Sequence, residues 1–460
     1  MRVPSLPRGV AAAAARGAGR LSQRLGRGGG TTLPGLVLTR LRPEATAEMA
    51  GGITGGVILV SGTNGKTTTA RLIRAALDAS GAEVVANTAG SNLERGVAAA
   101  LLDADGAEMA LFEVDEAALG GLIDQTRPRA VALMNLFRDQ LDRYGELEHL
   151  VERWREAVDG LDAATVLIYN ADDPAVAEVA GQHPNTLSYG IDDARVGRDR
   201  LPHAADTTDC RRCGAPLHYD MVTIAHLGRW SCLECGLARP RPDVGATRVE
   251  LHGMGGQRLA LAAPSGPIEL SLRLPGLHNA YNAIAATAVA LALGLAAESI
   301  GPALARRPAA FGRSERTPVG NARLTTLLAK NPAGANENIR TMLLEGGALH
   351  LVVLLNDRTA DGQDVSWVWD VDYELLLQSD RLESLTVGGD RAHDMALRFR
   401  YAGLDPGGLS VAPSVPAALD AGLAACGTGD LYVLPTYTAL LELQGVLASR
   451  GLAPAFWEDQ

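Results

Sequence analysis

Residues 57–80 of this chain, VILVSGTNGKTTTARLIRAALDAS, decide its fold. The first four are apolar and mostly β-branched, which predicts a strand, and the later apolar residues recur at helical spacing. Between them lies a glycine-rich turn, Gly62-Thr63-Asn64-Gly65-Lys66-Thr67-Thr68. Its backbone N–H groups can close around phosphate oxygens at the start of the helix. Lys66 would bring a compact charge to the phosphates and the Thr67 hydroxyl can bind Mg²⁺, so the stretch predicts a nucleotide-binding loop.

The strand–helix pattern continues on the C-terminal side of this loop. Strand-like runs recur at residues 109–114, 130–136 and 164–170, with helical stretches between them. This alternation predicts an α/β fold with a mostly parallel sheet covered by helices. The pattern breaks between residues 203 and 245, where paired cysteines, Gly and Pro indicate an inserted module. A β-rich stretch at 258–274 and an Ala-rich helix over about 280–295 follow it.

A domain boundary is expected near residues 311–318, because new strand-like runs then follow at 349–355, 384–389 and 430–436. We therefore expect three parts. These are an N-terminal segment (1–50), a central nucleotide-binding domain (51–312) that carries the insert, and a smaller α/β C-terminal domain (313–460).

The paired cysteines form two C-x-x-C motifs separated by 18 residues: Cys210, Cys213, Cys232 and Cys235. A glycine follows each pair and permits a knuckle turn whose N–H groups face the sulfurs. Four thiolates at this spacing suit tetrahedral Zn²⁺ in a closed, structural site, and a redox role is the alternative. The fifth cysteine, Cys426, lies in no nucleophile motif, and we expect it to be a small buried residue.

Composition limits the partners and the location. The net charge is −11, which argues against a nucleic-acid binder that relies on a basic surface. No apolar run approaches the length of a membrane span. The first 30 residues are rich in Arg and lack acids, so they could touch a membrane surface or a partner, or form a solvated helix. Cysteines that suit a metal site, and no disulfide framework, indicate a reducing compartment. We therefore expect a cytoplasmic chain that can lie at the inner face of the cell membrane.

Six motifs resemble those of the Mur ligases and folylpolyglutamate synthetases, in the order of that family. They are residues 62–68, 112–116, 135–145, 170–173, 276–282 and 311–315. The resemblance implies an ATP-dependent enzyme that joins an amine to a carboxylate through an acyl phosphate. It implies Mg²⁺ at Glu113, adenine-side contacts at Asn279 and Asn282, and anion contacts at Arg313 and Lys330.

The chain departs from that family at several positions. Only 61 residues precede Gly62, which leaves no room for a UDP-sugar domain of about 100 residues. Gln140 stands where the family has a metal-site His. The only two lysines are Lys66 and Lys330, so no lysine lies between them to form the carboxylated bridge that many members use. Lys330 itself replaces a His, and the ribose-binding Asp is missing.

These departures resemble the MurT branch, the ligase-like subunits of lipid II isoglutaminyl synthase. Its signatures are similar to residues 26–35, 330–334, 360–367 and 388–392. The resemblance implies a heterodimer with a GatD-type glutaminase and amidation of the D-glutamate α-carboxyl of lipid II. It further implies an Asp that completes a triad with the Cys and His of the partner, for which Asp361 is slightly preferred to Asp364.

Other interpretations of these residues stay open. The acids of residues 360–374 could simply cap a helix or form a turn, and Trp367 and Trp369 could anchor an interface or belong to the core. The whole chain could instead be a stand-alone amino-acid ligase, or an ATP-binding scaffold for a glutaminase without catalysis of its own.

Overall fold

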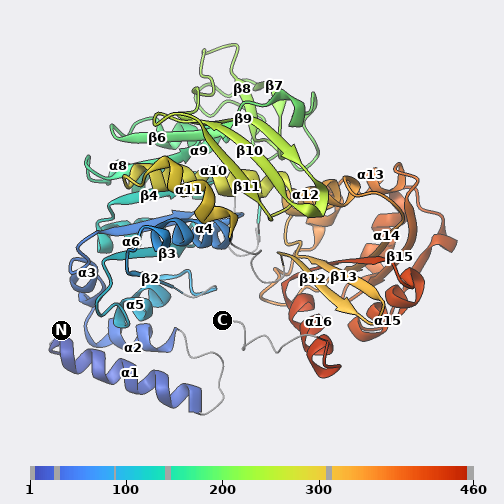
Figure 1. Ribbon diagram of the computed structural model, residues 1–460, viewed down its shortest axis with the longest axis horizontal. Coiled ribbons are helices and arrows are strands. Elements are labelled where there is room, and N and C mark those ends of the chain that lie inside the picture. The colour runs from blue at the N-terminus through green and yellow to red at the C-terminus, as the bar shows by residue number, and fades with distance from the viewer. Residues whose placement is uncertain (1–5, 25–31, 88–89, 140–146, 307–312, 453–460) are drawn as a thin grey trace.

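The computed structural model describes residues 6–24, 32–87, 90–139, 147–306 and 313–452. Within these residues two large sheets lie in different parts of the molecule, one of nine strands and one of six. A two-stranded sheet lies above the first (Figure 1). The α/β fold class predicted from the strand–helix alternation is confirmed.

The nine-stranded sheet has the order β11-β10-β9-β6-β5-β4-β1-β3-β2. Its strands are β1 (Val57–Ser61), β2 (Val84–Ala86), β3 (Met109–Val114), β4 (Ala130–Leu133), β5 (Val166–Asn170), β6 (Thr186–Ile191), β9 (Val244–Leu251), β10 (Gln257–Ala262) and β11 (Ile268–Leu272). Pairing is parallel from β2 through β9 and antiparallel in β9-β10-β11. The central strands are buried on both faces, as expected for a parallel sheet between helical layers.

Helices cover both faces of this sheet. One layer contains α4 (Lys66–Ala79), α10 (Leu277–Ala292) and α11 (Ala297–Ala305), and the other contains α5 (Glu94–Leu102), α6 (Leu119–Thr126), α8 (Leu147–Asp159) and α9 (Pro174–Ala180). Strand β1 shows how the sheet divides the core. Ile58 and Val60 pack in the first layer, whereas Val57 and Leu59 pack in the second. Side chains that alternate between the two layers hold β1 in the middle of the domain, and this fixes where the loop after β1 begins.

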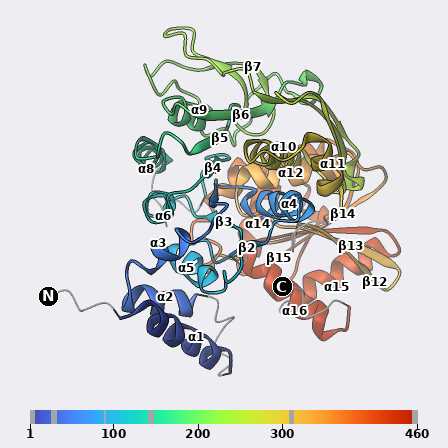
Figure 2. The same cartoon turned by 60° about the vertical axis from the view of Figure 1, so that its left-hand side comes forward.

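The N-terminal segment forms α1 (Arg8–Arg24), α2 (Leu33–Leu41) and α3 (Ala45–Ala50). Helix α2 packs on α5, and α1 packs on α2 at the outer edge of the molecule (Figures 1 and 2). A Cβ at Gly35 would lie 1.8 Å from the carbonyl oxygen of Arg95, so this close approach requires glycine. Ala11 and Ala15 are buried, while Val10 and Leu21 are exposed. Within the described residues, no helix has the length and apolar character needed to cross a membrane.

The cysteine-containing insert folds around the two-stranded sheet of β7 (His218–Val222) and β8 (Gly228–Ser231). It sits on the loop after β5. The indole N–H of Trp230 donates to the carbonyl of Ala171 at 3.1 Å, and the N–H of Gly228 donates to that of Asp172 at 3.0 Å. Trp230 is buried, so the insert shares a core with the sheet beneath it.

The six-stranded sheet has the order β12-β13-β17-β14-β15-β16. Its strands are β12 (Arg313–Val319), β13 (Ala322–Leu327), β14 (Leu349–Leu354), β15 (Leu382–Gly388), β16 (Leu409–Val411) and β17 (Asp430–Pro435). All pairs are parallel except β12 with β13. The helices are α12 (Pro332–Leu343), α13 (Glu374–Leu377), α14 (Ala392–Tyr401), α15 (Val415–Cys426) and α16 (Tyr437–Ser449). Helix α12 contacts α10, and this contact brings the two sheets together around the loop after β1.

Candidate nucleotide site between the two sheets

The glycine-rich loop joins β1 to α4, where the sequence predicted it. Gly65 immediately precedes α4 and has a left-handed backbone with φ of 91°. A Cβ at Gly65 would lie 2.1 Å from the amide oxygen of Asn282. Glycine is therefore required here both by the backbone conformation and by the close approach of α10.

Lys66, the first residue of α4, is held by two acceptors. Its Nζ donates to the carbonyl of Gly62 at 2.6 Å and to Oε2 of Glu116 at 2.9 Å. Burial has the largest single effect and lowers the pKa of Lys66. The charge and hydrogen bond of Glu116, together with the charges of Asp115 and Glu113, outweigh it and raise that pKa. Desolvation of Glu116 is likewise outweighed by the charge and hydrogen bond of Lys66 together with the charge of Lys330, so the pKa of this carboxyl is lowered. The ammonium group is thus kept charged at the place where phosphate oxygens would lie.

Glu113 and the acids after it form a cluster beside Lys66. Glu113, Asp115 and Glu116 are all buried, at 5%, 5% and 8% exposure. The backbone of Glu113 is fixed by Asn87, whose amide accepts from its N–H at 3.0 Å and donates to its carbonyl at 2.9 Å. Since Ser61 pairs with Val114, the ends of β1 and β3 are neighbours. Carboxylate oxygens near the first turn of α4 are ligands of the kind that Mg²⁺ prefers.

Asn279 and Asn282 lie in the first turns of α10 and connect it to α4. Asn282 accepts from the Thr69 hydroxyl at 3.3 Å and donates to Asn279 at 2.9 Å, while Asn279 donates to the carbonyl of Pro275 at 2.7 Å. A cleft of about 800 Å³ opens next to them, between the two sheets. Its walls include Gly65 and Asn282 from one side and residues around α12 from the other.

Lys330 enters this cleft from the six-stranded sheet. Its Nζ donates to Oδ2 of Asp139 at 2.5 Å and to the carbonyl of Thr63 at 3.2 Å. Desolvation raises the pKa of Asp139 despite this pairing. Next to it, Asn331 and Asn64 exchange amide hydrogen bonds of 3.0 and 3.3 Å. Both lysines of the chain therefore contact the glycine-rich loop, one from each sheet.

Two residues named from the sequence cannot be placed. The backbone of Arg313 begins β12, but its side chain lies outside the described residues. Gln140 also lies outside them.

A second hollow of about 420 Å³ borders the first. Lys330 and Asn331 line both hollows, and Asp364, Ser366 and Trp367 line the second. Asp364 is exposed, and its pKa is lowered by hydrogen bonds from the side chain and the backbone N–H of Ser366. Asp364 and Lys330 therefore line the same hollow.

Asp361 has a different environment. It is 7% exposed, and both of its oxygens accept from Thr438, one from the N–H at 2.7 Å and one from the hydroxyl at 2.5 Å. Thr438 lies in the first turn of α16, so Asp361 caps that helix from a distant segment. Asp361 is therefore a buried helix cap, whereas Asp364 is an exposed residue at the edge of the second hollow.

The four cysteines of the insert converge. Their Sγ atoms all lie within 4.8 Å of one another. Gly214 and Gly236 both have positive φ, as the knuckle turns require. The donor set and its compactness fit tetrahedral zinc. Cys426 is buried at the end of α15, away from this cluster.

Comparison with known proteins identifies the family. Residues 60–230 match the Mur ligase middle domain, and residues 328–440 match the MurT ligase C-terminal domain. The chain is 33% identical over 437 residues to the lipid II isoglutaminyl synthase (glutamine-hydrolyzing) subunit MurT of Streptococcus pneumoniae, covering 93% of this chain and 94% of that one. The chain belongs to the MurT family. A second MurT, from Staphylococcus aureus strain N315, is 29% identical and covers 81% of this chain and 83% of its own.

Solved structures agree on the fold. A pseudomurein peptide ligase type C from Methanothermus fervidus has a TM-score of 0.67 at 23% identity, over 86% of this chain and 79% of its own. MurF ligase from Thermotoga maritima in complex with ADP has a TM-score of 0.65 at 16% identity, over 88% and 83%. The predicted membership of the MurT branch and the predicted Mur ligase fold are thus both confirmed.

Some contacts of the site were not predicted from the sequence. Glu116 was part of a quoted motif, but its pairing with Lys66 was not foreseen, and neither was the pairing of Asp139 with Lys330. Asn64 was named for the loop, without its partner Asn331. The sequence did contain a signal for the first pairing. The acids at 113–116 end an apolar strand, and carboxylates buried there need a cation as a partner.

The close packing at Gly65 gives a testable prediction. Gly65→Ala should weaken ADP binding by at least tenfold, because the new Cβ would displace Asn282 and strain the loop. Gly81→Ala is the matched control. Gly81 also has positive φ, at 85°, but nothing lies within 4 Å of its Cβ position, so this variant should cost stability and leave ADP affinity unchanged. Calorimetric titration with Mg-ADP measures the affinity of both variants. Equal affinities of Gly65→Ala and Gly81→Ala would contradict the proposed place of the nucleotide.

Proposed function

We propose that this chain is the ATP-dependent synthase subunit of a lipid II isoglutaminyl synthase. The observation that carries the proposal is a complete phosphate loop, with Lys66 charged, in a chain whose MurT relatives bear that name. The reaction would amidate the α-carboxyl of D-glutamate in lipid II and give D-isoglutamine, as a step of peptidoglycan synthesis.

The reaction has two steps. A carboxylate oxygen attacks the γ-phosphorus of ATP, which breaks the bond to the β-phosphate oxygen and gives an acyl phosphate and ADP. Ammonia then attacks the acyl carbon, a proton is lost, and inorganic phosphate leaves. Phosphoryl transfer depends on alignment and charge neutralisation more than on covalent help.

Residues 62–68 would bind the phosphates in this mechanism, with Lys66 against the β- and γ-phosphates. Thr67 and Glu113 would hold Mg²⁺, which supplies charge neutralisation when bound. Asn279 and Asn282 position the adenine side of the cleft. Lys330 and Arg313 would contact the transferred phosphoryl group from the C-terminal side.

The division into parts supports this mechanism. We assign nucleotide binding to the central domain (51–312) and closure over the nucleotide to the C-terminal domain (313–460). The contacts of Lys330 with Thr63 and of Asn331 with Asn64 hold the two parts in register at the loop. The cysteine insert (203–245) would hold structural Zn²⁺, and residues 1–50 would form the outer edge that packs on α5.

A glutaminase partner of the GatD type would supply the ammonia. We now favour Asp364 over Asp361 as the acid that completes the partner's triad, because Asp364 is exposed whereas both oxygens of Asp361 are engaged by Thr438. The hollow lined by Asp364 and Lys330 would then receive ammonia close to the acyl phosphate.

The chain would act in the cytoplasm, at the inner face of the cell membrane that carries lipid II. Helix α1 supports this assignment. It carries Arg8 and Arg20 with no acidic residue, while Arg16 pairs with Asp105, and it exposes Val10 by 54% and Leu21 by 59%. Arginine side chains and exposed apolar residues suit the surface of an anionic bilayer.

One assay tests the proposed function. ATP consumption by the chain with a glutaminase partner should require both glutamine and lipid II, with ADP, phosphate and amidated lipid II formed in equal amounts. Turnover without the partner, driven by a free amino acid, would favour a stand-alone ligase. Glutamine hydrolysis without any ATP consumption would favour a non-catalytic scaffold. Either result would overturn the proposal.

A further inference from the structure

The cysteine insert reaches beneath the nucleotide site through two residues that lie outside its C-x-x-C motifs. Asp206 precedes the first cysteine pair, and His226 lies between β7 and β8. The side chain of Asp206 is 5% exposed and that of His226 is fully buried. Neither residue has a part in the mechanism described above.

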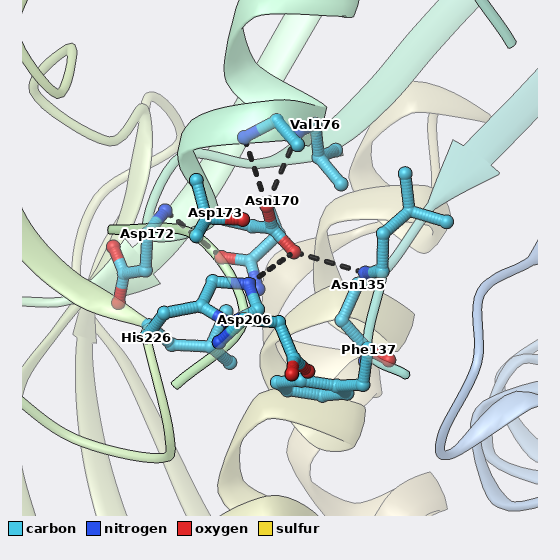
Figure 3. Close-up of polar contacts among 12 residues, drawn as sticks. Asn135, Phe137, Asn170, Asp172, Asp173, Val176, Asp206 and His226 are labelled. Atoms are coloured by element: carbon cyan, nitrogen blue, oxygen red, sulfur yellow. Dashed lines mark hydrogen bonds and ion pairs between the residues drawn. The ribbon is translucent and has the colours of Figure 1, made fainter. Parts of the chain in front are cut away.

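The buried ring of His226 has a defined orientation. Its Nδ1 accepts from the backbone N–H of Asp206 at 3.2 Å, so this nitrogen carries no proton. Nε2 therefore carries the proton. It lies 3.4 Å from Oδ2 of Asp173, which is also fully buried, and it makes no hydrogen bond within the described residues. The ring packs against Phe137 with centroids 5.1 Å apart. Figure 3 shows the side chains of His226, Asp173 and Phe137 close to one another.

Asp173 connects this histidine to the segment that supports the loop. Its Oδ1 caps α9 by accepting from Ala175 at 3.0 Å and Val176 at 3.2 Å. Its Oδ2 accepts from the N–H of Leu136 at 2.9 Å (Figure 3). The carboxylate that faces His226 therefore also fixes the backbone immediately after Asn135.

Asp206 holds the same segment two residues further on. One of its oxygens accepts from the N–H of Arg138 at 2.9 Å, and the other pairs with the guanidinium of Arg138. The same guanidinium donates to Asp370 at 3.1 Å, in the C-terminal part of the chain. The insert therefore contacts Phe137 through His226 and Arg138 through Asp206, while Asp173 holds Leu136 from the loop after β5.

Residues 135–139 in turn support the glycine-rich loop. Asn135 accepts from the N–H of Asn64 at 2.8 Å and donates to its carbonyl at 3.0 Å. The hydroxyl of Thr63 accepts from the N–H of Phe137 at 3.0 Å. Asp139 pairs with Lys330. A shift of this segment would therefore displace both the loop and the lysine that closes over it.

We propose that the cysteine insert is a positioning element of the nucleotide site, with His226 and Asp206 as its contacts and metal occupancy of the cysteines as its support. This inference rests on the proposed function only in taking the cleft to bind nucleotide. The insert is anchored at Ala171 and Asp172, next to Asp173. Asp206 lies four residues before Cys210 and His226 lies six residues before Cys232, so loss of the metal would release both. A purely local role of the insert would leave the loop unaffected.

Three variants test the proposal in the full chain with its partner present. His226→Phe keeps an aromatic ring but loses the acceptor for Asp206, and we expect its Kd for Mg-ADP to rise about tenfold, which equals 1.4 kcal/mol. His226→Asn can restore an acceptor near the Nδ1 position and should recover part of the affinity. His218→Phe is the matched control, because His218 lies in the same insert and its side chain is 53% exposed. It should bind Mg-ADP as the unaltered chain does.

Hydrogen exchange distinguishes positioning from general destabilisation. In His226→Phe the amides of residues 135–139 should exchange faster, whereas those of β1 and β3 should be unchanged. Removal of zinc from the unaltered chain with a chelator should produce the same two effects. The proposal fails if His226→Phe folds, keeps its zinc and binds Mg-ADP normally, or, where that variant does not fold, if the zinc-free chain binds Mg-ADP normally. Absence of ADP binding by the unaltered chain would instead refute the proposed function.

Discussion

Replacing Lys66 with alanine should lower the turnover number for amidation by about 100- to 1000-fold, the range typical for loss of one charge-stabilising donor. The ammonium group of Lys66 lies at the start of α4 in the central domain, and its pairing with Glu116 keeps it protonated. Without it, charge that develops on the transferred phosphoryl group would meet the carboxylates of 113–116 alone. Turnover is measured as amidated lipid II formed with saturating glutamine and ATP.

Stability must be separated from catalysis in this variant. Removing one partner of a buried ion pair costs about 3–5 kcal/mol, because the other charge stays buried. The double variant Lys66→Ala with Glu116→Gln removes that uncompensated charge and should recover much of the lost stability, measured by urea unfolding. Amidation should stay at the level of the single variant. Recovery of amidation in the double variant, or normal amidation in Lys66→Ala, would contradict the assignment of Lys66.

The parts of the fold that follow from local pattern could be predicted from the sequence. Strand β1, the loop and α4 are contiguous, so hydrophobic periodicity and two glycines suffice to define them. The convergence of the four cysteines likewise follows from the spacing within each pair. The strand expected at 130–136 ends at Leu133 in the structure, because Asn135 leaves the sheet to bond with Asn64. That bond depends on a partner 71 residues away, which no local pattern encodes.

The contacts that give the site its electrostatics are long-range and could not be predicted. Glu116 is 50 residues from Lys66, and Asp139 is 191 residues from Lys330. Composition supplied one useful constraint, since a chain with two lysines has few ways to neutralise buried acids with ammonium groups. Both lysines lie against buried carboxylates, and arginines pair with others, as Arg138 does with Asp206 and Arg239 with Asp172.

The cap formed by Asp361 was among the interpretations left open for the acids of residues 360–374. The sequence favoured Asp361 slightly as a catalytic acid, on resemblance. The structure shows it bound to Thr438, 77 residues later, at the start of α16. A turn rich in Asp and Gly predicts a capping role for some residue, but the identity of the capped helix depends on how the sheet brings α16 beside the turn.

Asp364→Asn should lower glutamine hydrolysis in the complex by about 10⁴-fold, the loss typical when the acid of a triad no longer orients its histidine. Asp364 is exposed on the outer side of the second hollow, where a partner's histidine can reach it. Mg-ADP binding should be unchanged. Amidation supported by ammonium chloride in place of glutamine should also be retained, because the ligase steps do not use this carboxylate.

Asp361→Asn is the matched comparison for this prediction, since it makes the same chemical change three residues away. It weakens the cap of α16 and should lower the free energy of unfolding by about 1 kcal/mol. Glutamine hydrolysis, measured well below the unfolding temperature, should then stay within a few-fold of the unaltered complex. If Asp361→Asn instead loses hydrolysis while Asp364→Asn keeps it, and both retain amidation with ammonium chloride, Asp361 is the acid that faces the partner. If both variants keep full hydrolysis, the partner's triad is completed without this chain.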